Sequence, residues 1–326
     1  MLTAFSCNDG RPHRILDMDT EQALAKAAWI DLVSATEEEI ERVQQATGLT
    51  VPTEAALSEI ETSSRLAVRN GVLYLSMPLV SMVEGPRVVS VGFVLSTERL
   101  ITVRFARSRV FEAYADQLPR GEIAHTTGTH IFVGLLEAIV DRQADALEQV
   151  RVDLDGISHR IFRRGTLTHG GRKQEDAMLR QTLTQLGHIG DLISHIRESE
   201  VAAARIVPFV EVTASDWLPK NLKPRLRTLR RDIASVADFD THLNDKLQFM
   251  LDATLGFINI AQNNVMKVMT IASVAGIPPV LIAGIYGMNF SLMPELHWTW
   301  GYPFGLALIV ISALIPLLIF RWRKWI

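Results

Sequence analysis

Cysteine is almost absent from this sequence, since Cys7 is the only one among 326 residues. A single thiol excludes an internal disulfide and any cysteine-rich metal cluster, and it fits a reducing compartment. An excess of either charge is also lacking, because 33 Lys and Arg stand against 36 Asp and Glu, a net charge of −3. Neither nucleic acid nor an acidic substrate is therefore expected as a partner. The first residues, MLTAFSCNDGRPHR, lack the apolar stretch of a cleavable signal peptide, so none is expected.

Motifs of the common enzyme classes are absent as well. The sequence contains no G-x-x-x-x-G-K-[ST], no H-E-x-x-H and no G-x-S-x-G. These patterns place a nucleotide phosphate, a catalytic zinc or a nucleophilic serine. We therefore expect no enzymatic activity.

Two long stretches near the carboxyl end lack charge altogether. Residues 268–287 read VMTIASVAGIPPVLIAGIYG and residues 302–320 read YPFGLALIVISALIPLLIF. Each has the roughly 20 residues that an α-helix needs to cross about 30 Å of hydrocarbon. A buried hairpin in a large soluble core is the alternative. Two such runs, close together at the end of a chain, favour two membrane spans.

Basic residues flank this pair of spans on both outer sides: Lys267, Arg321, Arg323 and Lys324. The loop between the spans, residues 288–301, has no Lys or Arg. The positive-inside rule therefore predicts that both termini are cytoplasmic and that the loop, with Asn289 and Glu295, faces outward. Residues 321–326 would then form a short cytoplasmic tail.

The first 127 residues favour a cytoplasmic α/β domain. Four β-rich runs are bounded by Gly, Pro or charged turns: 29–33, 72–80, 88–95 and 100–105. After the first run, TEEEIERVQQATG predicts a capped helix, with Thr36 as the N-cap, Glu39 three residues later and Gly48 at the end. We interpret the acidic residues of its first turn as partners of the helix dipole rather than as a cation site.

Residues 128–220 carry a charged helical pattern that is interrupted at Gly165 and at Gly170–Gly171, which predicts a long helical hairpin. Within it, His188, Asp191 and His195 share one face at helical spacing and could be read as a metal site. No fourth ligand accompanies these three side chains. A polar helix surface is therefore the simpler interpretation.

Residues 221–267 predict a stalk helix that continues into the first span, because no proline occurs between Pro224 and Pro278. As one α-helix, this stretch is about 80 Å long at about 1.5 Å per residue. That length is enough to cross the bilayer and to project well into the cytoplasm.

A face of small and polar residues repeats every 3.5 positions along this helix. Alternating steps of four and three select Asp252, Gly256, Asn259, Asn263, Met266, Thr270, Ser273, Ile277, Val280 and Gly284. We call these ten residues the polar face. Thr270 and Ser273, the only Thr and Ser of the first span, both belong to it.

Such a repeat implies helices packed around a common axis. Polar groups in a membrane helix face either a partner helix or a water-filled cavity. The repeat by itself therefore leaves two alternatives, a tight interface of small residues or a wet pore. Two spans are too few to enclose a conduction path, so a pore requires several copies of the chain.

The loop between the spans carries the most specific motif of the sequence. YGMNF and MPEL, at Tyr286–Phe290 and Met293–Leu296, resemble the motif of the CorA family of magnesium and cobalt channels. Further segments resemble the enterobacterial type of this family, namely MLTAF, AWIDLV, GFINIAQN, the Pro278-Pro279 pair, WGYP and the basic, Trp-ending tail. The resemblance covers the whole chain.

This resemblance implies an α+β membrane protein that assembles as a homopentameric funnel in the inner membrane of a bacterium. The first span would line the pore and the second would form an outer ring. Gly287, Met288 and Asn289 would form the selectivity filter. Other family positions along the pore and its cytoplasmic throat match Asp252, Asn263, Met266, Met269 and Ile277. All of these except Met269 lie on the polar face, which favours the pore over the dry interface.

The resemblance further implies Mg²⁺ as the transported and regulatory ion, with Co²⁺ and Ni²⁺ as further candidates for transport. Carbonyl oxygens of an Asn289 ring can accept hydrogen bonds from hydrated Mg²⁺, which sheds its water reluctantly. Carboxylates there would bind too tightly for the ion to leave. Glu295 would raise the local cation concentration. Ile277 and Met266 would supply apolar constrictions that close by dewetting.

Two points concern positions around the pore and in the stalk. Many relatives carry Met-Pro-Leu-Thr where this chain has Ile277-Pro278-Pro279-Val280, so position 280 lacks the hydroxyl on which an intermediate ion site there would depend. Regulatory Mg²⁺ sites are implied between cytoplasmic domains, and the candidate ligands are Asp232, Asp238, Asp240 and Asp245. An ordinary solvated charge is the alternative for each of these.

Two other functions remain as alternatives. The zinc-transporting branch of the same superfamily typically has Gly-Val-Asn or Gly-Ile-Asn, against which Met288 and the MPEL motif argue. A membrane-anchored sensor or scaffold would pack its helices without a conduit. The expected partners are divalent metal ions, membrane lipid and further copies of the chain.

Overall fold

The computed structural model describes residues 1–8, 11–15, 21–59, 65–81, 87–118, 127–164, 172–288, 293–294 and 298–323. The chain divides into two compact units. The first unit contains Met1–Gly170 with Gln181–Met250, and the second contains Gly171–Arg180 with Leu251–Ile326. Two long helices, α7 (Arg172–Thr213) and α8 (Leu222–Tyr286), contribute residues to both units.

The first unit contains a mixed sheet of seven strands in the order β2-β1-β3-β7-β6-β5-β4. The strands are β1 (Leu2–Asn8), β2 (Arg11–Arg14), β3 (Trp29–Val33), β4 (Leu66–Arg69), β5 (Val72–Ser81), β6 (Arg87–Leu95) and β7 (Leu100–Arg104). β3 and β7 pair in parallel, whereas the other neighbouring strands are antiparallel. The four runs predicted as strands are confirmed as β3, β5, β6 and β7, but β1, β2 and β4 were not predicted.

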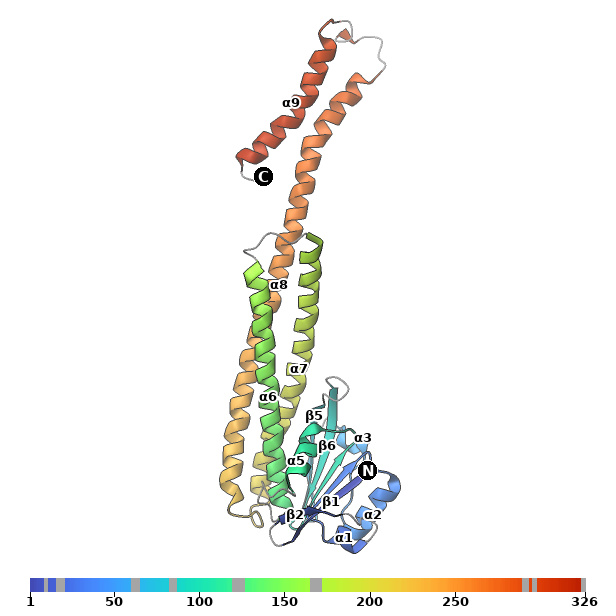
Figure 1. Cartoon of the computed structure of the whole chain (residues 1–326), viewed down its shortest axis with the longest axis vertical. Helices are drawn as coiled ribbons and strands as arrows, with labels where there is room; N and C mark the ends of the chain where they lie inside the picture. The colour runs from blue at the N-terminus through green and yellow to red at the C-terminus, as the bar shows by residue number, and fades with distance from the viewer. Residues whose placement is uncertain are drawn as a thin grey trace. The chain divides into compact units, whose positions relative to one another are not determined.

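Helices cover both faces of this sheet (Figure 1). One face packs against α1 (Glu21–Ala25), α2 (Glu37–Thr47) and α3 (Glu54–Leu57) through a buried cluster that includes Ile30, Val43 and Ile101. The other face packs against α5 (Arg109–Gln117), α6 (Gly128–Arg164) and α7. Adjacent residues such as Leu100 and Ile101 enter opposite clusters, because side chains alternate between the two faces of a strand.

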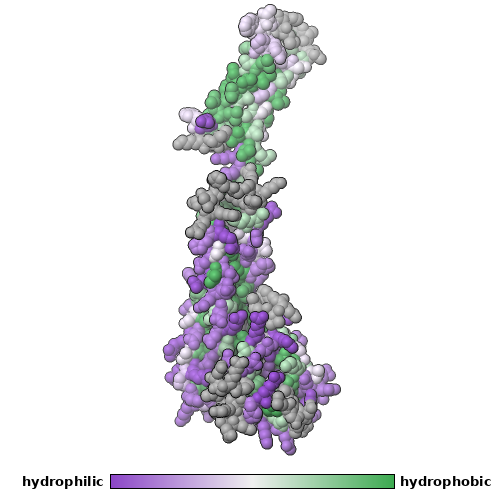
Figure 2. Space-filling view, viewed as in Figure 1, coloured by the Kyte–Doolittle hydropathy of each residue, from purple (hydrophilic) through white to green (hydrophobic). Residues whose placement is uncertain are grey.

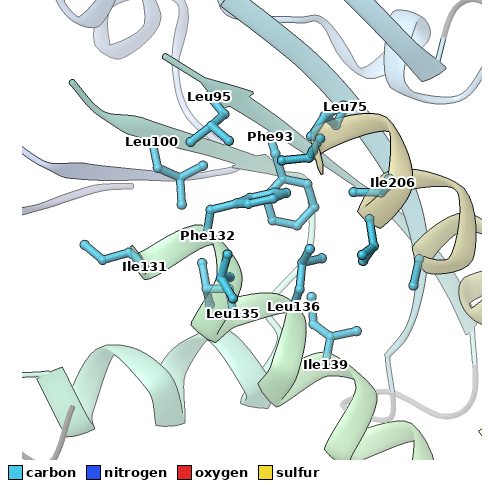
Figure 3. Close-up of a cluster of buried hydrophobic side chains, with 14 of the residues drawn as sticks. Leu75, Phe93, Leu95, Leu100, Ile131, Phe132, Leu135, Leu136, Ile139 and Ile206 are labelled. Atoms are coloured by element: carbon cyan, nitrogen blue, oxygen red, sulfur yellow. The ribbon is translucent and has the colours of Figure 1, made fainter. Parts of the chain in front are cut away.

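The larger cluster fixes α6 on the sheet. Figure 3 shows Phe132, Leu135 and Leu136 of α6 directed toward Phe93 of β6 and Leu100 of β7. The rings of Phe93 and Phe132 meet edge to face, with centroids 5.5 Å apart, an arrangement that aromatic pairs prefer. All five side chains are essentially inaccessible to solvent. The first turns of α6 are therefore part of the α/β core.

The predicted capping of α2 is confirmed. Thr36 Oγ1 accepts from the Glu39 amide at 3.3 Å, and Glu39 Oε2 accepts from the Thr36 amide at 3.0 Å. Gly48 has a φ of 69° and its amide donates to the Gln44 carbonyl at 2.8 Å. A residue with a Cβ is strained in this left-handed conformation, which explains why the helix ends on glycine.

Within the first unit, α6, α7 and the first part of α8 run side by side (Figure 1). Gln143 of α6 donates from Nε2 to Ser199 Oγ of α7 at 2.6 Å. Lys246 of α8 donates from Nζ to Asp155 Oδ1 of α6 at 2.5 Å. The predicted helical hairpin is confirmed as α6 and α7, while the predicted breaks at Gly165 and Gly170–Gly171 lie outside the described residues.

The second unit holds the apolar end of α8 and the helix α9 (Gly301–Trp322). Both helices are long and apolar enough to span a membrane, and none of the residues in the most apolar stretch of either is buried. Figure 2 shows hydrophobic surface over these segments. The two predicted spans therefore coincide with helices whose surfaces suit lipid or other helices rather than water.

α8 is one helix of 65 residues, about 98 Å long at about 1.5 Å per residue. It begins at Leu222, so Pro224 falls in its first turn, where a missing amide hydrogen costs little. Pro278 and Pro279 lie inside the helix and cannot donate to the carbonyls one turn earlier. The prediction that a stalk helix continues into the first span is confirmed.

Candidate functional site

The polar face lies on α8, from Asp252 to Gly284, within the second unit. Every one of its ten residues is exposed in the single chain. Large apolar side chains on the flanking positions, among them Leu255, Ile260 and Val268, are exposed as well. Lipid, water or further copies of the chain must therefore cover this helix.

Three residues of the polar face share one depression on α8. Asn263, Met266 and Thr270 line a hollow of about 380 Å³, together with Ile260, Asn264 and Lys267. Thr270 Oγ1 donates its hydrogen to the Met266 carbonyl at 2.8 Å. The hydroxyl oxygen therefore offers only lone pairs outward, which is the polarity that suits a hydrated cation.

Gly287 and Met288 directly follow the last residue of α8, Tyr286, and their amides donate back into the helix. The Gly287 amide donates to the Ala283 carbonyl at 3.0 Å, and the Met288 amide donates to the Ile285 carbonyl at 3.2 Å. A Cβ on Gly287 would lie 3.2 Å from the Ala283 oxygen, a close contact that favours glycine. Asn289 and Glu295, the expected filter and attracting residues, lie outside the described residues.

The candidate regulatory carboxylates do not share one environment. Asp232, Asp238 and Asp245 are exposed on α8, whereas Asp240 is fully buried. Asp240 Oδ2 accepts from Arg197 Nη1 of α7 at 3.0 Å. Its side chain therefore points into the subunit rather than toward a neighbouring copy.

An acidic group on α6 that includes Asp141, which interacts with Asp232, was missed in the sequence. The pKa of Asp141 is raised by burial and then by the neighbouring charges of Glu137, Asp232 and Asp145. These carboxylates come from α6 and α8, so their proximity depends on helix packing. The charged helical pattern of residues 128–220 gave no signal that would single them out.

The alternative metal site on α7 gains no support. Among the described residues, no group of three or more His, Cys, Asp or Glu side chains is arranged to hold a metal ion. His188 and Asp191 are exposed, in keeping with the interpretation of a polar helix surface. His195 differs, because it is half-buried and its Nδ1 is enclosed without a hydrogen-bond partner.

Comparison with known proteins identifies the family. The model of the family described as "CorA-like Mg2+ transporter protein" matches residues 25–323. Relatives named "Magnesium transport protein CorA" from Haemophilus ducreyi and Haemophilus influenzae are 30% and 31% identical over 328 residues, covering 100% of both chains in each case.

A solved structure shares the fold over its full length. The CorA magnesium transporter from Methanocaldococcus jannaschii aligns with a TM-score of 0.78 at 18% identity, covering 100% of this chain and 99% of that one. The resemblance inferred from the GMN and MPEL motifs is thereby confirmed. This chain belongs to the CorA-like Mg²⁺ transporter protein family.

Proposed function

We propose that the chain is a magnesium channel that assembles as a homopentamer in the bacterial inner membrane. The observation that carries this proposal is the polar face on α8, which repeats every 3.5 residues on a helix that is long and apolar enough to span a membrane. The relatives' shared name, magnesium transport protein, supports the choice of ion.

Several copies are required because one chain offers only two candidate spans among its described residues. Packed around an axis, copies of α8 would direct the polar face inward and the flanking Leu, Ile and Val toward α9 and lipid. Asp252, Asn259, Asn263, Met266, Thr270, Ser273, Ile277, Val280 and Gly284 would then line the passage. Met269, the residue before Thr270, does not belong to the polar face and would lie at the edge of the passage.

Selection would take place at the ring of Gly287, Met288 and Asn289. Neutral amide oxygens can accept hydrogen bonds from the water shell of Mg²⁺ without replacing it. Such binding is strong enough for Mg²⁺ to enter the ring and weak enough for it to leave, and ion conduction requires both. Co²⁺ and Ni²⁺ have the same charge and would be further transported ions. Glu295 would attract cations to the entrance.

The hydroxyl of Thr270 supports a hydrated passage. Because its hydrogen is committed to the Met266 carbonyl, each copy would present an acceptor to the ion's water. Position 280 has no hydroxyl, so Thr270 and Ser273 supply the aliphatic hydroxyl groups of the first span. Ile277 and Met266 would close the passage by excluding water.

Regulation by intracellular Mg²⁺ would use carboxylates on the subunit surface. Asp232, Asp238 and Asp245 are exposed and stay candidates, and Asp141 joins Asp232 in an acidic group. Loss of bound Mg²⁺ would restore repulsion between subunits and allow the stalks to separate. This arrangement requires both termini to be cytoplasmic, as the basic flanks of the spans predict.

The decisive experiment measures ion flux by the purified protein in liposomes that contain a Mg²⁺ indicator. We expect Mg²⁺ uptake that exceeds Zn²⁺ uptake under equal gradients, together with five subunits per particle in detergent. Faster Zn²⁺ flux would favour the zinc-transporting alternative. A monomer that carries no ion would favour the membrane-anchored sensor or scaffold.

A further inference from the structure

Two carboxyl groups buried between α7 and α8 line the same cavity in the first unit. Glu200 of α7 is 3% exposed and Asp240 of α8 is 0% exposed. One oxygen of each, Oε1 of Glu200 and Oδ1 of Asp240, is enclosed and has no hydrogen-bond partner. Buried polar atoms are nearly always satisfied in folded proteins, so these two oxygens require an explanation.

The charges around this cavity do not balance. Arg197 Nη1 donates to Asp240 Oδ2 at 3.0 Å, which neutralises one carboxylate and leaves Oδ1 free. Arg230 also lines the cavity, but its Nη1 lies 3.9 Å from Glu211 Oε2. Glu200 is therefore a second buried carboxyl group without a basic residue of its own. A buried charge of this kind is strongly unfavourable unless it takes up a cation or a proton.

We propose that Glu200 and Asp240 together hold one divalent cation inside each subunit. Mg²⁺ is typically bound by one or two carboxylates and keeps several of its own waters. The cavity measures about 320 Å³, which leaves room for those waters at about 30 Å³ each. The two oxygens without a hydrogen-bond partner, Oε1 of Glu200 on α7 and Oδ1 of Asp240 on α8, would complete the coordination shell. The identification of the ion as Mg²⁺ rests on the proposed function. The existence of a cation site does not depend on that function.

Two further groups suit the water shell of such an ion. Thr241 and Asp238 line the same cavity. The Thr241 hydroxyl donates to the Ala237 carbonyl at 3.0 Å, so its lone pairs can accept from coordinated water. Asp238 adds a carboxylate at the more exposed side. The cavity therefore supplies acceptors for the outer shell as well as two direct ligands.

This site differs from the regulatory sites that the family resemblance implies, because it lies within one subunit. The ion would connect α7 to α8, the helix that continues into the first candidate span. Burial, followed by the charge of Asp240, raises the pKa of Glu200 to about 7. Burial also raises the pKa of Asp240, so the cation competes with protons for this pair of carboxyl groups.

The test counts bound ions in the full-length protein in detergent, with Mn²⁺ as a paramagnetic substitute for Mg²⁺. Glu200→Gln is expected to lose one Mn²⁺ per chain, and excess Mg²⁺ is expected to release the same ion from the wild type. Glu198→Gln is the matched control, because Glu198 is exposed on the same helix two residues away. An unchanged Mn²⁺ count in Glu200→Gln overturns the proposal, even if its stability responds differently to pH.

A second measurement uses the wild type alone, in case Glu200→Gln does not fold. Fe²⁺ bound in the site, with ascorbate and peroxide, should cut the backbone close to Glu200 and close to Asp240. Excess Mg²⁺ should suppress both cuts, and the absence of cuts at these two places overturns the proposal. Mg²⁺ uptake into liposomes, measured on the same preparation, separates the cation site from the proposed channel. If the Glu200-dependent ion is bound but no Mg²⁺ is taken up, only the channel function is refuted.

Discussion

Glu137 of α6 and Arg225 in the first turn of α8 form an ion pair through two parallel hydrogen bonds. Arg225 Nε donates to Glu137 Oε1 at 3.0 Å, and Nη2 donates to Oε2. Both side chains are about one-third exposed. A two-bonded guanidinium–carboxylate pair has a defined geometry, so it fixes the beginning of α8 against the helix that is anchored in the α/β core.

Removal of this pair should loosen the first unit. Glu137→Gln keeps the shape of the side chain but loses its charge, and we expect the free energy of unfolding to fall by about 1–2 kcal/mol. Glu148→Gln, at an exposed position of the same helix, should leave stability unchanged. Thermal unfolding in detergent measures both, and equal melting temperatures for the two variants would show that the pair contributes nothing.

Asn289→Ala should abolish Mg²⁺ uptake, because a methyl group cannot accept hydrogen bonds from the hydrated ion. The subunits should still assemble, since the helices α8 and α9 that would pack between copies are unchanged in this variant. Ser291→Ala, in the same loop, serves as the control and should transport normally. Wild-type uptake by Asn289→Ala, measured in liposomes, would count decisively against the filter.

Asn263→Leu and Thr270→Leu distinguish a wet pore from a dry helix interface. Bulky apolar side chains on the polar face should block conduction, since they narrow the passage and favour dewetting. Asn264→Leu is a matched control: Asn264 borders the same hollow but does not belong to the polar face, since it lies about 100° around the helix from Asn263. If all three variants transport at the wild-type rate, the polar face does not line a conduit.

The pH dependence of stability should reveal Glu200. Its pKa is raised from 4.5 to about 7 by burial and by Asp240. Between these values the folded chain holds a proton that the unfolded chain has lost, so this contribution is complete below about pH 4.5 and is lost as the pH rises through about 7. In metal-free buffer, Glu200→Gln should therefore gain stability relative to the wild type as the pH is raised from 5 to 8.

A melting-temperature difference that does not change over this range would contradict the prediction. Glu198→Gln should parallel the wild type throughout. Addition of Mg²⁺ at pH 8 should reduce the difference in melting temperature between Glu200→Gln and the wild type. The reason is that only the wild type has both buried carboxylates, so only there can the ion replace the proton as their partner.

The elements that could be predicted were those with a local cause. Thr36, Glu39 and Gly48 specify a helix through contacts within a few residues, and the structure has that helix with its caps. The strands β3, β5, β6 and β7 were recognisable because they are largely apolar runs that end at turn residues. β1 was missed although it lies beside β3, because its pairing with β3 joins residues that are distant in the chain, such as Leu2 and Leu32.

The carboxylates of α8 illustrate the opposite case. Asp238 and Asp240 are two positions apart in a charged helix, and nothing local separates them. One is exposed, whereas the other is enclosed by α7 and paired with Arg197. Nothing in the sequence around Glu200 predicted that its side chain is buried, since part of its environment comes from α8, which begins 22 residues later.

The sequence by itself determined the two apolar spans, the polar repeat on the first of them and the family, because charge-free length, helical period and a short motif are properties of neighbouring residues. Only the tertiary structure decided which carboxylates are buried and which helices share them. Burial depends on the surfaces that pack together, and residues far apart in the chain, such as Glu200 and Asp240, meet only when the fold is complete.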